Sequence, residues 1–266
     1  MTVASRSPDS RPLSHPCKLQ PQAAVRNAMQ QVTMRGKVLL QSPEEWGARN
    51  RILAHHMGLL IASHIQPATL QALDLGCQTG KLIDILAPQT GLRWRGIDPN
   101  IKESTVTAVG AEIQHGWGHE IPFPDGTFDC VLLANVFEHV DPQYRPKTLK
   151  EIRRVLSPSG ILVGQLPNPY FPIESHSRLP FMGWLPVRAQ KAYWRLSPVA
   201  WRHDFHVVTM GKLTREAEQA GLVTVLARNF NYPLEAIPHR VRPVVRLLRR
   251  PMQRVPWAWQ FVFRRR

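Results

Sequence analysis

A turn between residues 74 and 80 has the residue types of a ligand-binding loop. It reads D-L-G-C-Q-T-G and leads into the helix-like run K-L-I-D-I-L-A. Gly76 and Gly80 let the backbone approach a ligand closely or adopt positive φ. A helix that begins at Lys81 would present free N–H groups to that ligand. These residues alone leave two interpretations open: a loop for a phosphate or a nucleoside, and a tight turn without a ligand.

The spacing favours a nucleoside over a phosphate or a dinucleotide. A phosphate loop would end in G-K-[S/T], and a dinucleotide loop would read G-x-G-x-x-G. Here Leu82 follows Gly80 and Lys81, so no hydroxyl is available for Mg²⁺. A second acid, Asp98, closes the next predicted strand after that of Asp74. An acid at that place can accept hydrogen bonds from both hydroxyls of a ribose.

Alternating strand and helix signals around this turn predict the sheet that positions it. Apolar runs of strand length alternate with amphipathic runs of helix length. That order is typical of an α/β, doubly wound fold with a mostly parallel sheet. The predicted strands are 71–76, 93–98, 111–116, 128–135, 161–167 and 222–230. The predicted helices start at 42–46 and cover 81–87, 104–110, 146–156 and 209–221, with a turn at 157–160.

Taken in order, these motifs resemble a known enzyme family. The segments D-L-G-C-Q-T-G, G-I-D-P-N, N-V-F-E-H-V and L-K-E-I-R-R-V-L-S-P-S-G lie within about residues 70–168. They are similar to those of the class I S-adenosylmethionine-dependent methyltransferases, most of all the small-molecule group that includes ubiquinone-biosynthesis O-methyltransferases. The resemblance implies a Rossmann-like, seven-stranded sheet. Its last strand, within P-W-A-W-Q-F-V-F-R-R-R, would pair antiparallel with 222–230.

The resemblance also implies which residues hold S-adenosylmethionine. Asp74 would bind the methionine amino group, directly or through water, and Asp98 would bind the ribose hydroxyls. The other implied contacts are Gly76, Cys77 and Gly80 at the methionine, Pro99, Asn100, Gly116, Trp117 and Gly118 at the adenine, and Asn135 and Val136 near the sulfonium.

Two positions depart from the family's pattern. The family often has Gly where Gln78 stands, and often has Asp where Trp117 stands. Trp cannot accept a hydrogen bond from the adenine amino group, so adenine would be held by backbone contacts and ring stacking. A non-catalytic relative that keeps the fold is therefore one alternative.

The acceptor pocket would lie under a lid insertion at 168–206, which follows the fifth strand. The insertion is rich in aromatic residues, which favours a sizeable apolar or ring-bearing acceptor; packing within the insertion is the alternative. A hydroxyl acceptor needs a base, and the candidates are His139, Glu174 and His176. The alternatives are helix packing for His139 and a solvent-facing loop for the other two. H-D-F-H at 203–206 is a weak match to a metal motif, and no metal site is predicted.

Positive charge is concentrated at the two ends of the chain. The formal net charge is +15, yet residues 44–235 hold 19 basic and 18 acidic side chains. This near-neutral body makes nucleic acid a less favoured partner. Residues 1–43 are predicted to be a mostly disordered tail, with an organelle transit peptide as the alternative. The three scattered cysteines favour a reducing compartment, and we predict a cytoplasmic protein.

The basic segment 231–266 is predicted to hold an amphipathic helix before the final strand. A helix over 240–250 would place valines and a leucine opposite a basic side, which is typical of a helix on an anionic membrane. The segment 240–254 is therefore a candidate for contact with such a membrane. The basic side would consist of Arg242, Arg246, Arg249 and Arg250. A solvated face of a docked helix is an equal alternative, and contact with RNA ranks third.

We therefore expect one methyltransferase domain over 44–230. The expected reaction is methyl transfer from S-adenosylmethionine to a small-molecule or lipid-linked acceptor, at oxygen. An RNA methyltransferase and a non-catalytic adaptor are the alternatives. The sequence names neither the acceptor nor the oligomeric state.

Overall fold

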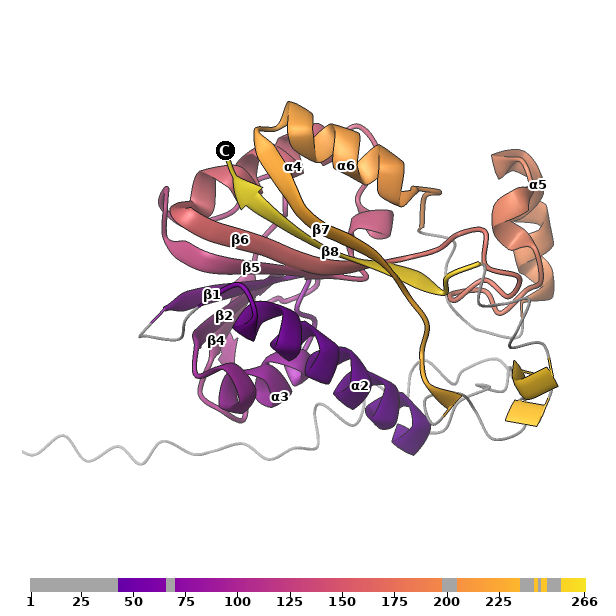
Figure 1. Cartoon of the computed structure of the whole chain (residues 1–266), viewed down its shortest axis with the longest axis horizontal. Coiled ribbons are helices and arrows are strands. Elements are labelled where there is room, and N and C mark those ends of the chain that lie inside the picture. The colour runs from indigo at the N-terminus through magenta and orange to yellow at the C-terminus, as the bar shows by residue number, and fades with distance from the viewer. Residues whose placement is uncertain (1–42, 66–69, 198–204, 235–241, 244, 248–254) are drawn as a thin grey trace, which may run out of the picture.

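The computed structural model describes residues 43–65, 70–197, 205–234, 242–243, 245–247 and 255–266 (Figure 1). Almost all of the predicted tail at 1–43 lies outside the described residues. So do Arg249 and Arg250 of the predicted basic helix, and His203 and Asp204 of the H-D-F-H segment. Within the described ranges, no helix has the length and apolar character that crossing a membrane requires.

A mixed sheet of eight strands forms the centre of the described part. The strands are β1 (Gln71–Leu75), β2 (Arg93–Asp98), β3 (Thr105–Val106), β4 (Glu112–His115), β5 (Phe128–Ala134), β6 (Leu156–Pro167), β7 (Leu222–Phe230) and β8 (Ala258–Arg265). Their order across the sheet is β3-β4-β2-β1-β5-β6-β8-β7. The strands from β4 to β6 in that order pair in parallel, whereas β8 runs antiparallel to both of its neighbours. The predicted α/β, doubly wound class and the antiparallel last strand are confirmed.

Strand β3 lies where a helix was predicted, and it makes the sheet one strand larger than expected. Residues 104–110 were expected to form a short helix, but β3 pairs antiparallel with β4 instead. The Thr107 hydroxyl accepts a hydrogen bond from the Ala111 N–H at 3.2 Å, and Gly110 turns the chain at φ 77°. Thr and Val also favour extended backbone. The helix prediction is wrong because these residues form the first arm and the turn of a hairpin.

Strand β6 begins earlier than its apolar run. A turn was predicted at 157–160, yet β6 already starts at Leu156. Leu156 pairs with Phe128, and Ile161 pairs with Cys130 two residues further along β5. The intervening residues therefore bulge out of the ladder, as an extra stretch on one strand must.

Helices cover both faces of the sheet (Figure 1). They are α2 (Pro43–Ala62), α3 (Lys81–Thr90), α4 (Arg145–Val155), α5 (Val187–Tyr193) and α6 (Met210–Gln219), with 3₁₀ turns η2 (Phe137–His139), η3 (Met182–Trp184) and η4 (Trp194–Leu196). Alternate residues of β5 point to opposite faces. Leu133 packs in the same core as Leu149 of α4, and Leu132 packs in the same core as Met57 of α2.

The lid insertion lies beyond the carboxyl ends of the parallel strands, on the side of the sheet where α5 stands (Figure 1). It has a small core of its own, made of Leu179, Met182, Trp194 and Phe205. Its start is tied to the chain before β8 by the stacked rings of Phe171 and Trp257, 4.6 Å apart. In open parallel sheets, ligands bind at this carboxyl edge.

Candidate functional site

The turn after β1 is held against the end of β2. The backbone N–H groups of Gly76 and Cys77 both donate to the Ile97 carbonyl, at 2.8 and 3.1 Å. Gly76 and Gly80 have φ of 80° and 73°, and a Cβ at either position would collide with a neighbouring side chain, Val136 or Thr107. Only Gly meets both the torsion and the space. Contacts within the protein therefore fix the conformation of this turn, and α3 begins directly after it.

Asp98 closes β2 with a carboxylate that faces this turn. Its Oδ2 accepts from the Gln78 N–H at 2.9 Å, and its Oδ1 accepts from the Asn100 N–H at 2.8 Å. The Asn100 side-chain amide donates to the same Oδ1 at 3.0 Å. An ionised carboxylate has about four acceptor sites. These three bonds leave one site on Asp98 for a sugar hydroxyl, and a second hydroxyl would have to replace the Asn100 side-chain amide. Asp98 is buried and is fixed in place before any ligand arrives.

Asp74 is a buried acid at the end of β1. Burial raises the pKa of Asp74 to about 7, and the neighbouring Asp98 carboxylate adds to the rise. An acid with such a pKa needs a positive partner to stay ionised. An ammonium group, such as that of a methionine moiety, would be that partner.

The two departures from the family's pattern have clear structural settings. Gln78 is exposed and adopts φ 50°, a left-handed conformation that Gly adopts more easily. Trp117 is 50% exposed, with its ring 6.3 Å from the ring of His115 and 5.6 Å from that of His119. The indole face is therefore open to a flat partner, while its position offers no acceptor oxygen.

The other predicted cofactor residues lie at the same edge of the sheet but differ in where their side chains and backbone are placed. Cys77 is buried and its Sγ lies against Gly96, so its side chain is committed to the core and only its backbone lines the turn. Asn135 leaves β5 at φ 58°. Val136 packs against Gly76. Pro99, Gly116 and Gly118 follow β2 and β4 at the same edge of the sheet.

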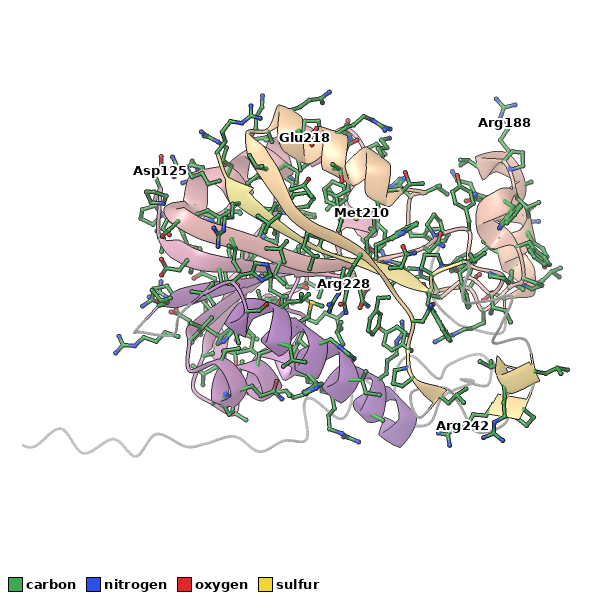
Figure 2. All side chains as sticks on the ribbon, viewed as in Figure 1. Asp125, Arg188, Met210, Glu218, Arg228 and Arg242 are labelled. Carbon is green, nitrogen blue, oxygen red and sulfur yellow. The ribbon has the colours of Figure 1, made fainter. Side chains whose placement is uncertain are left out.

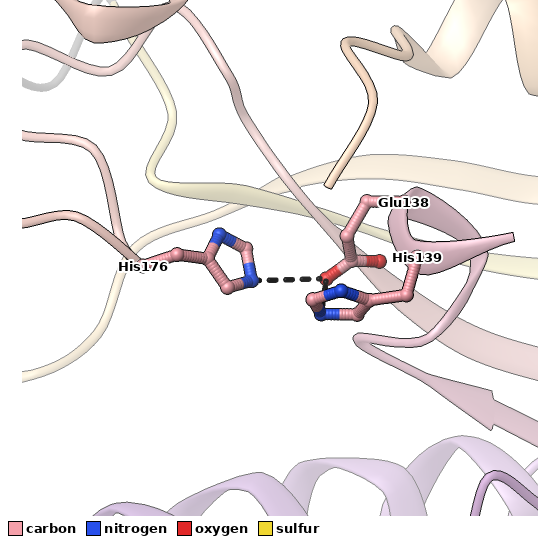
Figure 3. Close-up of side chains that lie close together, drawn as sticks. All are labelled: Glu138, His139 and His176. Atoms are coloured by element: carbon pink, nitrogen blue, oxygen red, sulfur yellow. Dashed lines mark ion pairs between the residues drawn. The ribbon is translucent and has the colours of Figure 1, made fainter. Parts of the chain in front are cut away.

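All three predicted catalytic residues come together at the base of the lid insertion. Figure 3 shows two of them, His139 and His176. The rings of His139 and His176 are 4.9 Å apart and nearly perpendicular. Glu174 Oε1 lies 2.6 Å from His176 Nδ1. Glu174 is buried, which would raise its pKa, but hydrogen bonds from His176 and from the His176 and Ser177 N–H groups outweigh burial and lower the pKa to about 2. Glu174 is thus an ionised carboxylate that orients His176.

Glu138 joins this group, although the sequence analysis did not name it. Its carboxylate is buried between the two histidines: His176 Nε2 is 3.7 Å and His139 Nε2 is 4.0 Å from Glu138 Oε1. Its place beside His139 in N-V-F-E-H-V was the available signal. We call Glu138, His139 and His176 the Glu–His cluster.

Comparison with known proteins agrees with this geometry. Residues 73–164 match the family model of a methyltransferase domain. A demethylmenaquinone methyltransferase of Staphylococcus aureus is 30% identical over 176 residues, which are 60% of this chain and 70% of that protein. The chain belongs to the S-adenosylmethionine-dependent methyltransferases.

Solved structures share the fold of this methyltransferase at low sequence identity. The PH0226 protein of Pyrococcus horikoshii is 16% identical with a TM-score of 0.55, covering 90% of this chain and 99% of its own. An S-adenosylmethionine-dependent methyltransferase of Mesorhizobium loti is 16% identical with a TM-score of 0.54, covering 85% and 100%.

S-Adenosylmethionine is the cofactor of this methyltransferase, and the turn after β1 fits it. Gly76 and Gly80 keep side chains out of the turn and hold it at positive φ, so a ligand can approach its backbone closely. The buried Asp74 matches an ammonium group, and the fixed Asp98 matches a sugar hydroxyl.

A cavity of about 590 Å³ opens at the same edge of the methyltransferase, past the end of β7. Its lining includes Phe171, Phe230, Tyr232 and Trp257, together with His56 and Arg228. Hydrogen bonds link its wall to the strand end that precedes the Glu–His cluster. Gln165 Nε2 donates to the Tyr232 hydroxyl at 2.7 Å and lies 3.2 Å from Asn135 Oδ1.

Proposed function

We propose that this methyltransferase transfers the methyl group of S-adenosylmethionine to an oxygen of a ring-bearing acceptor, either a small molecule or a lipid-linked one. The aromatic cavity past β7 is the observation that carries this proposal. Its volume of about 590 Å³ lies within the range of ordinary small-molecule sites. The name of the Staphylococcus aureus relative gives a quinone as its acceptor, which also supports a ring.

The walls of the cavity suit a flat acceptor with polar substituents. Phe230 and Tyr232 meet edge to face, with ring centroids 4.9 Å apart. Arg228 and His56 add polar groups at the same wall. The Arg228 guanidinium donates to Gln260 Oε1 at 2.8 Å, which fixes its position beside the strand (Figure 2). Aromatic walls with a few fixed polar groups are typical of pockets that orient a ring.

The reaction needs a place for one proton. The acceptor oxygen forms a bond to the methyl carbon while the carbon–sulfur bond breaks, and S-adenosylhomocysteine leaves. The acceptor O–H bond breaks, and its proton passes to the Glu–His cluster. The sulfonium is already activated, so in-line placement of the oxygen supplies much of the rate. Glu138 and His139 lie two and three residues after Val136 in the chain, which keeps this proton acceptor near the proposed donor site.

Methyl transfer from ¹³C-methyl-labelled S-adenosylmethionine tests the proposal. The protein would be incubated with separated small-molecule, lipid and RNA extracts, and the product carbon would be read by NMR. We expect label in a small-molecule or lipid fraction, in the methoxy region of the spectrum. Label on carbon or nitrogen, or label in RNA, would contradict it.

A matched pair of variants ties the product to the cavity. Phe230→Ala removes one aromatic wall and should raise the KM for the labelled acceptor at least about tenfold, or about 1.4 kcal/mol. Val225→Ala, an exposed position on the same strand, should leave KM within about twofold. Equal KM values for the two variants would mean that the acceptor does not bind in this cavity.

We also propose that the protein works at an anionic membrane surface. The predicted helix at 240–250 is described only in part, with Arg242 and Arg246 on it. Support comes from the lid insertion, where Phe181, Trp184 and Leu196 are 57%, 63% and 70% exposed.

Charge on the lid insertion matches that partner. Arg188, Lys191 and Arg195 are exposed on and after α5, and Arg188 projects away from the body (Figure 2). The sole acid among residues 168–197 is the buried Glu174. Aromatic and basic residues together suit the headgroup region of a membrane, where each basic residue contributes about 1 kcal/mol.

Flotation with vesicles of phosphatidylcholine alone, or with added phosphatidylglycerol, tests the membrane proposal. We expect binding to the anionic vesicles only, and loss of binding in the triple variant Arg188→Glu, Lys191→Glu, Arg195→Glu. The matched control is Arg93→Glu, Lys147→Glu, Lys150→Glu, which changes the charge equally at exposed positions outside the lid insertion. Equal flotation of both variants would end the proposal. So would RNA binding that the lid variant alone loses, without vesicle binding.

A further inference from the structure

The Glu–His cluster contains a buried carboxylate, that of Glu138, which has no hydrogen-bond partner in another described residue. The side chain of Glu138 is 4% exposed, and neither carboxylate oxygen accepts a hydrogen bond from another residue in the described part of the chain. A buried carboxylate in this state is costly unless it is protonated, paired with a cation or bound to a metal ion. Burial raises the pKa of Glu138, while the two histidines act in the opposite direction.

Two imidazoles direct the same ring nitrogen at this carboxylate. His139 comes from η2 beside the end of β5, and His176 comes from the lid insertion (Figure 3). One ligand atom from each of the three residues can be chosen so that all lie within 4.8 Å of one another. Ligands of a tetrahedral zinc ion with bonds of ~2.1 Å stand ~3.4 Å apart. Closure around an ion therefore needs side-chain shifts of about 1 Å, smaller than a rotamer change.

His176 is already oriented as a ligand. Glu174 Oε1 lies 2.6 Å from its Nδ1, and the His176 ring stacks on Phe205 at 5.1 Å. A hydrogen bond from Nδ1–H to a carboxylate leaves the lone pair of Nε2 free for a cation. This carboxylate–histidine–metal order is the usual outer support of protein metal sites. Glu174 is held in turn by the N–H groups of His176 and Ser177.

The buried Arg145 does not hydrogen-bond this carboxylate. Arg145 is fully buried and attracts Glu138 at longer range. Its guanidinium, however, donates to the carbonyls of Val140 and His206 at 3.1 and 3.4 Å. The carboxylate of Glu138 is left facing the two imidazoles.

We propose that Glu138, His139 and His176 bind one divalent transition-metal ion of the zinc class. Two imidazoles and one carboxylate are a common ligand set for such ions, and three protein ligands leave a coordination position open. The sequence does not predict this metal site because the third ligand, His176, lies 37 residues after His139 in the chain.

The open position deepens the proposed function. With an ion bound, the ligand atoms of the cluster could not take the acceptor proton. An acceptor hydroxyl bound at the open position would have a lowered pKa, so its proton would pass to water instead and its oxygen would attack the methyl carbon. This use rests on the proposed O-methylation, whereas ion binding does not.

Cobalt titration of the chelator-treated full-length protein tests the metal site without any acceptor. Co²⁺ reports its own geometry through visible absorption, and Zn²⁺ should displace it. We expect about one ion per chain, and affinity lowered at least about 100-fold by His176→Ala. Glu138→Gln should lower the affinity for Co²⁺ to a similar extent. Glu174 is a positioning residue, and Glu174→Gln should weaken Co²⁺ binding about 10–100-fold. His115→Ala, an exposed histidine elsewhere, is the control and should bind as the wild type does.

Two results would overturn the metal site. One is less than about 0.2 ion per chain at 100 µM free Co²⁺. The other is equal affinity of His176→Ala and His115→Ala. If Glu138→Gln fails to fold by circular dichroism, the His176→Ala comparison decides alone. Cobalt binding without a methoxy product would contradict only the proposed function, and a methoxy product without cobalt binding would contradict only the metal site.

Discussion

Asp74 is an ionisable group whose charge should depend on the cofactor. Its pKa of about 7 lies above the ordinary 3.8, so the protonated form is favoured in the folded protein without a ligand. Its contribution to stability is present below about pH 4 and is lost as pH rises through 7. A cofactor ammonium favours the ionised form instead. S-Adenosylmethionine should therefore bind more tightly as pH rises from about 6 to about 8, by at most about tenfold per pH unit.

Calorimetric titration in buffers of different ionisation enthalpy measures this effect as proton release on binding. Asp74→Asn should bind weakly and show no pH dependence over that range. Asp125→Asn changes an acid whose side chain is 78% exposed, at the opposite edge of the sheet (Figure 2), and should keep the wild-type profile. A flat wild-type profile would show that Asp74 does not meet the ammonium group.

Gln78 holds a conformation that its side chain disfavours. A left-handed conformation costs a residue other than Gly roughly 1–2 kcal/mol. Substitution by Gly removes this cost, but part of the gain in stability is offset because Gly loses more entropy on folding. Gln78→Gly should therefore raise the free energy of unfolding by about 0.5–1 kcal/mol, measured by urea denaturation. The N–H bond to Asp98 needs no side chain and should persist.

Gln89→Gly is the matched control for this change. Gln89 is exposed within α3, where Gly lowers stability by about 1 kcal/mol. The two variants should thus shift stability in opposite directions. Destabilisation by both would mean that the Gln78 side chain makes a contact worth more than its strain.

At the scale of elements, η3 depends on a glycine that touches the start of the lid insertion. A Cβ at Gly183 would overlap the Pro169 carbonyl, and a backbone atom cannot yield as a side chain can. Gly183→Ala should therefore displace η3, raise the acceptor KM at least about tenfold and change cofactor affinity less than about twofold. Steady-state kinetics and cofactor titration give the two values.

Gly211→Ala provides the comparison for the lid variant. A Cβ at Gly211 in α6 would meet only the end of the Arg215 side chain, at 3.7 Å. Ala there should be neutral or stabilising by up to about 1 kcal/mol. If Gly183→Ala left the acceptor KM unchanged, the insertion would not shape the acceptor site.

The elements that were predicted correctly are those whose local pattern agrees with their packing. Strand β5 is a continuous apolar run because both of its faces are covered, and α4 has the spacing of a helix with one buried face. By contrast, β3 is two exposed residues, and its turn depends on Thr107 meeting Ala111. Helix α5 lies in an insertion rich in Pro and aromatic residues, where no periodicity marked it.

The site divides in the same way. The turn after β1 was predictable because its acids and glycines are close in sequence and must lie at strand ends. The approach of Glu138 and His176 to each other was not predictable, because it depends on the path of the lid insertion. No local pattern encodes such a path.

At the scale of the whole molecule, β8 connects two parts of the sheet. Phe261 pairs with Gly164 of β6 and with Ala227 of β7, and it is fully buried. Phe261→Ala should lower the free energy of unfolding by about 3–5 kcal/mol, because it leaves a cavity beside the bare Gly164. Urea denaturation of the purified protein measures this loss.

Val223→Ala changes an exposed residue on the neighbouring strand and should stay within about 0.5 kcal/mol of the wild type. Similar stability of the two variants would mean that β8 adds little to the sheet.

The insertion of β8 between β6 and β7 has a consequence for the order of assembly during synthesis. Strand β7 leaves the ribosome before β8 exists, and among the described strands β8 is its one ladder neighbour. The hydrogen-bonding edge of β6 must likewise wait uncovered while about 90 further residues are made. Chaperones that shield extended backbone would therefore be needed most in that interval. The nascent chain would gain protease resistance only once β8 has emerged.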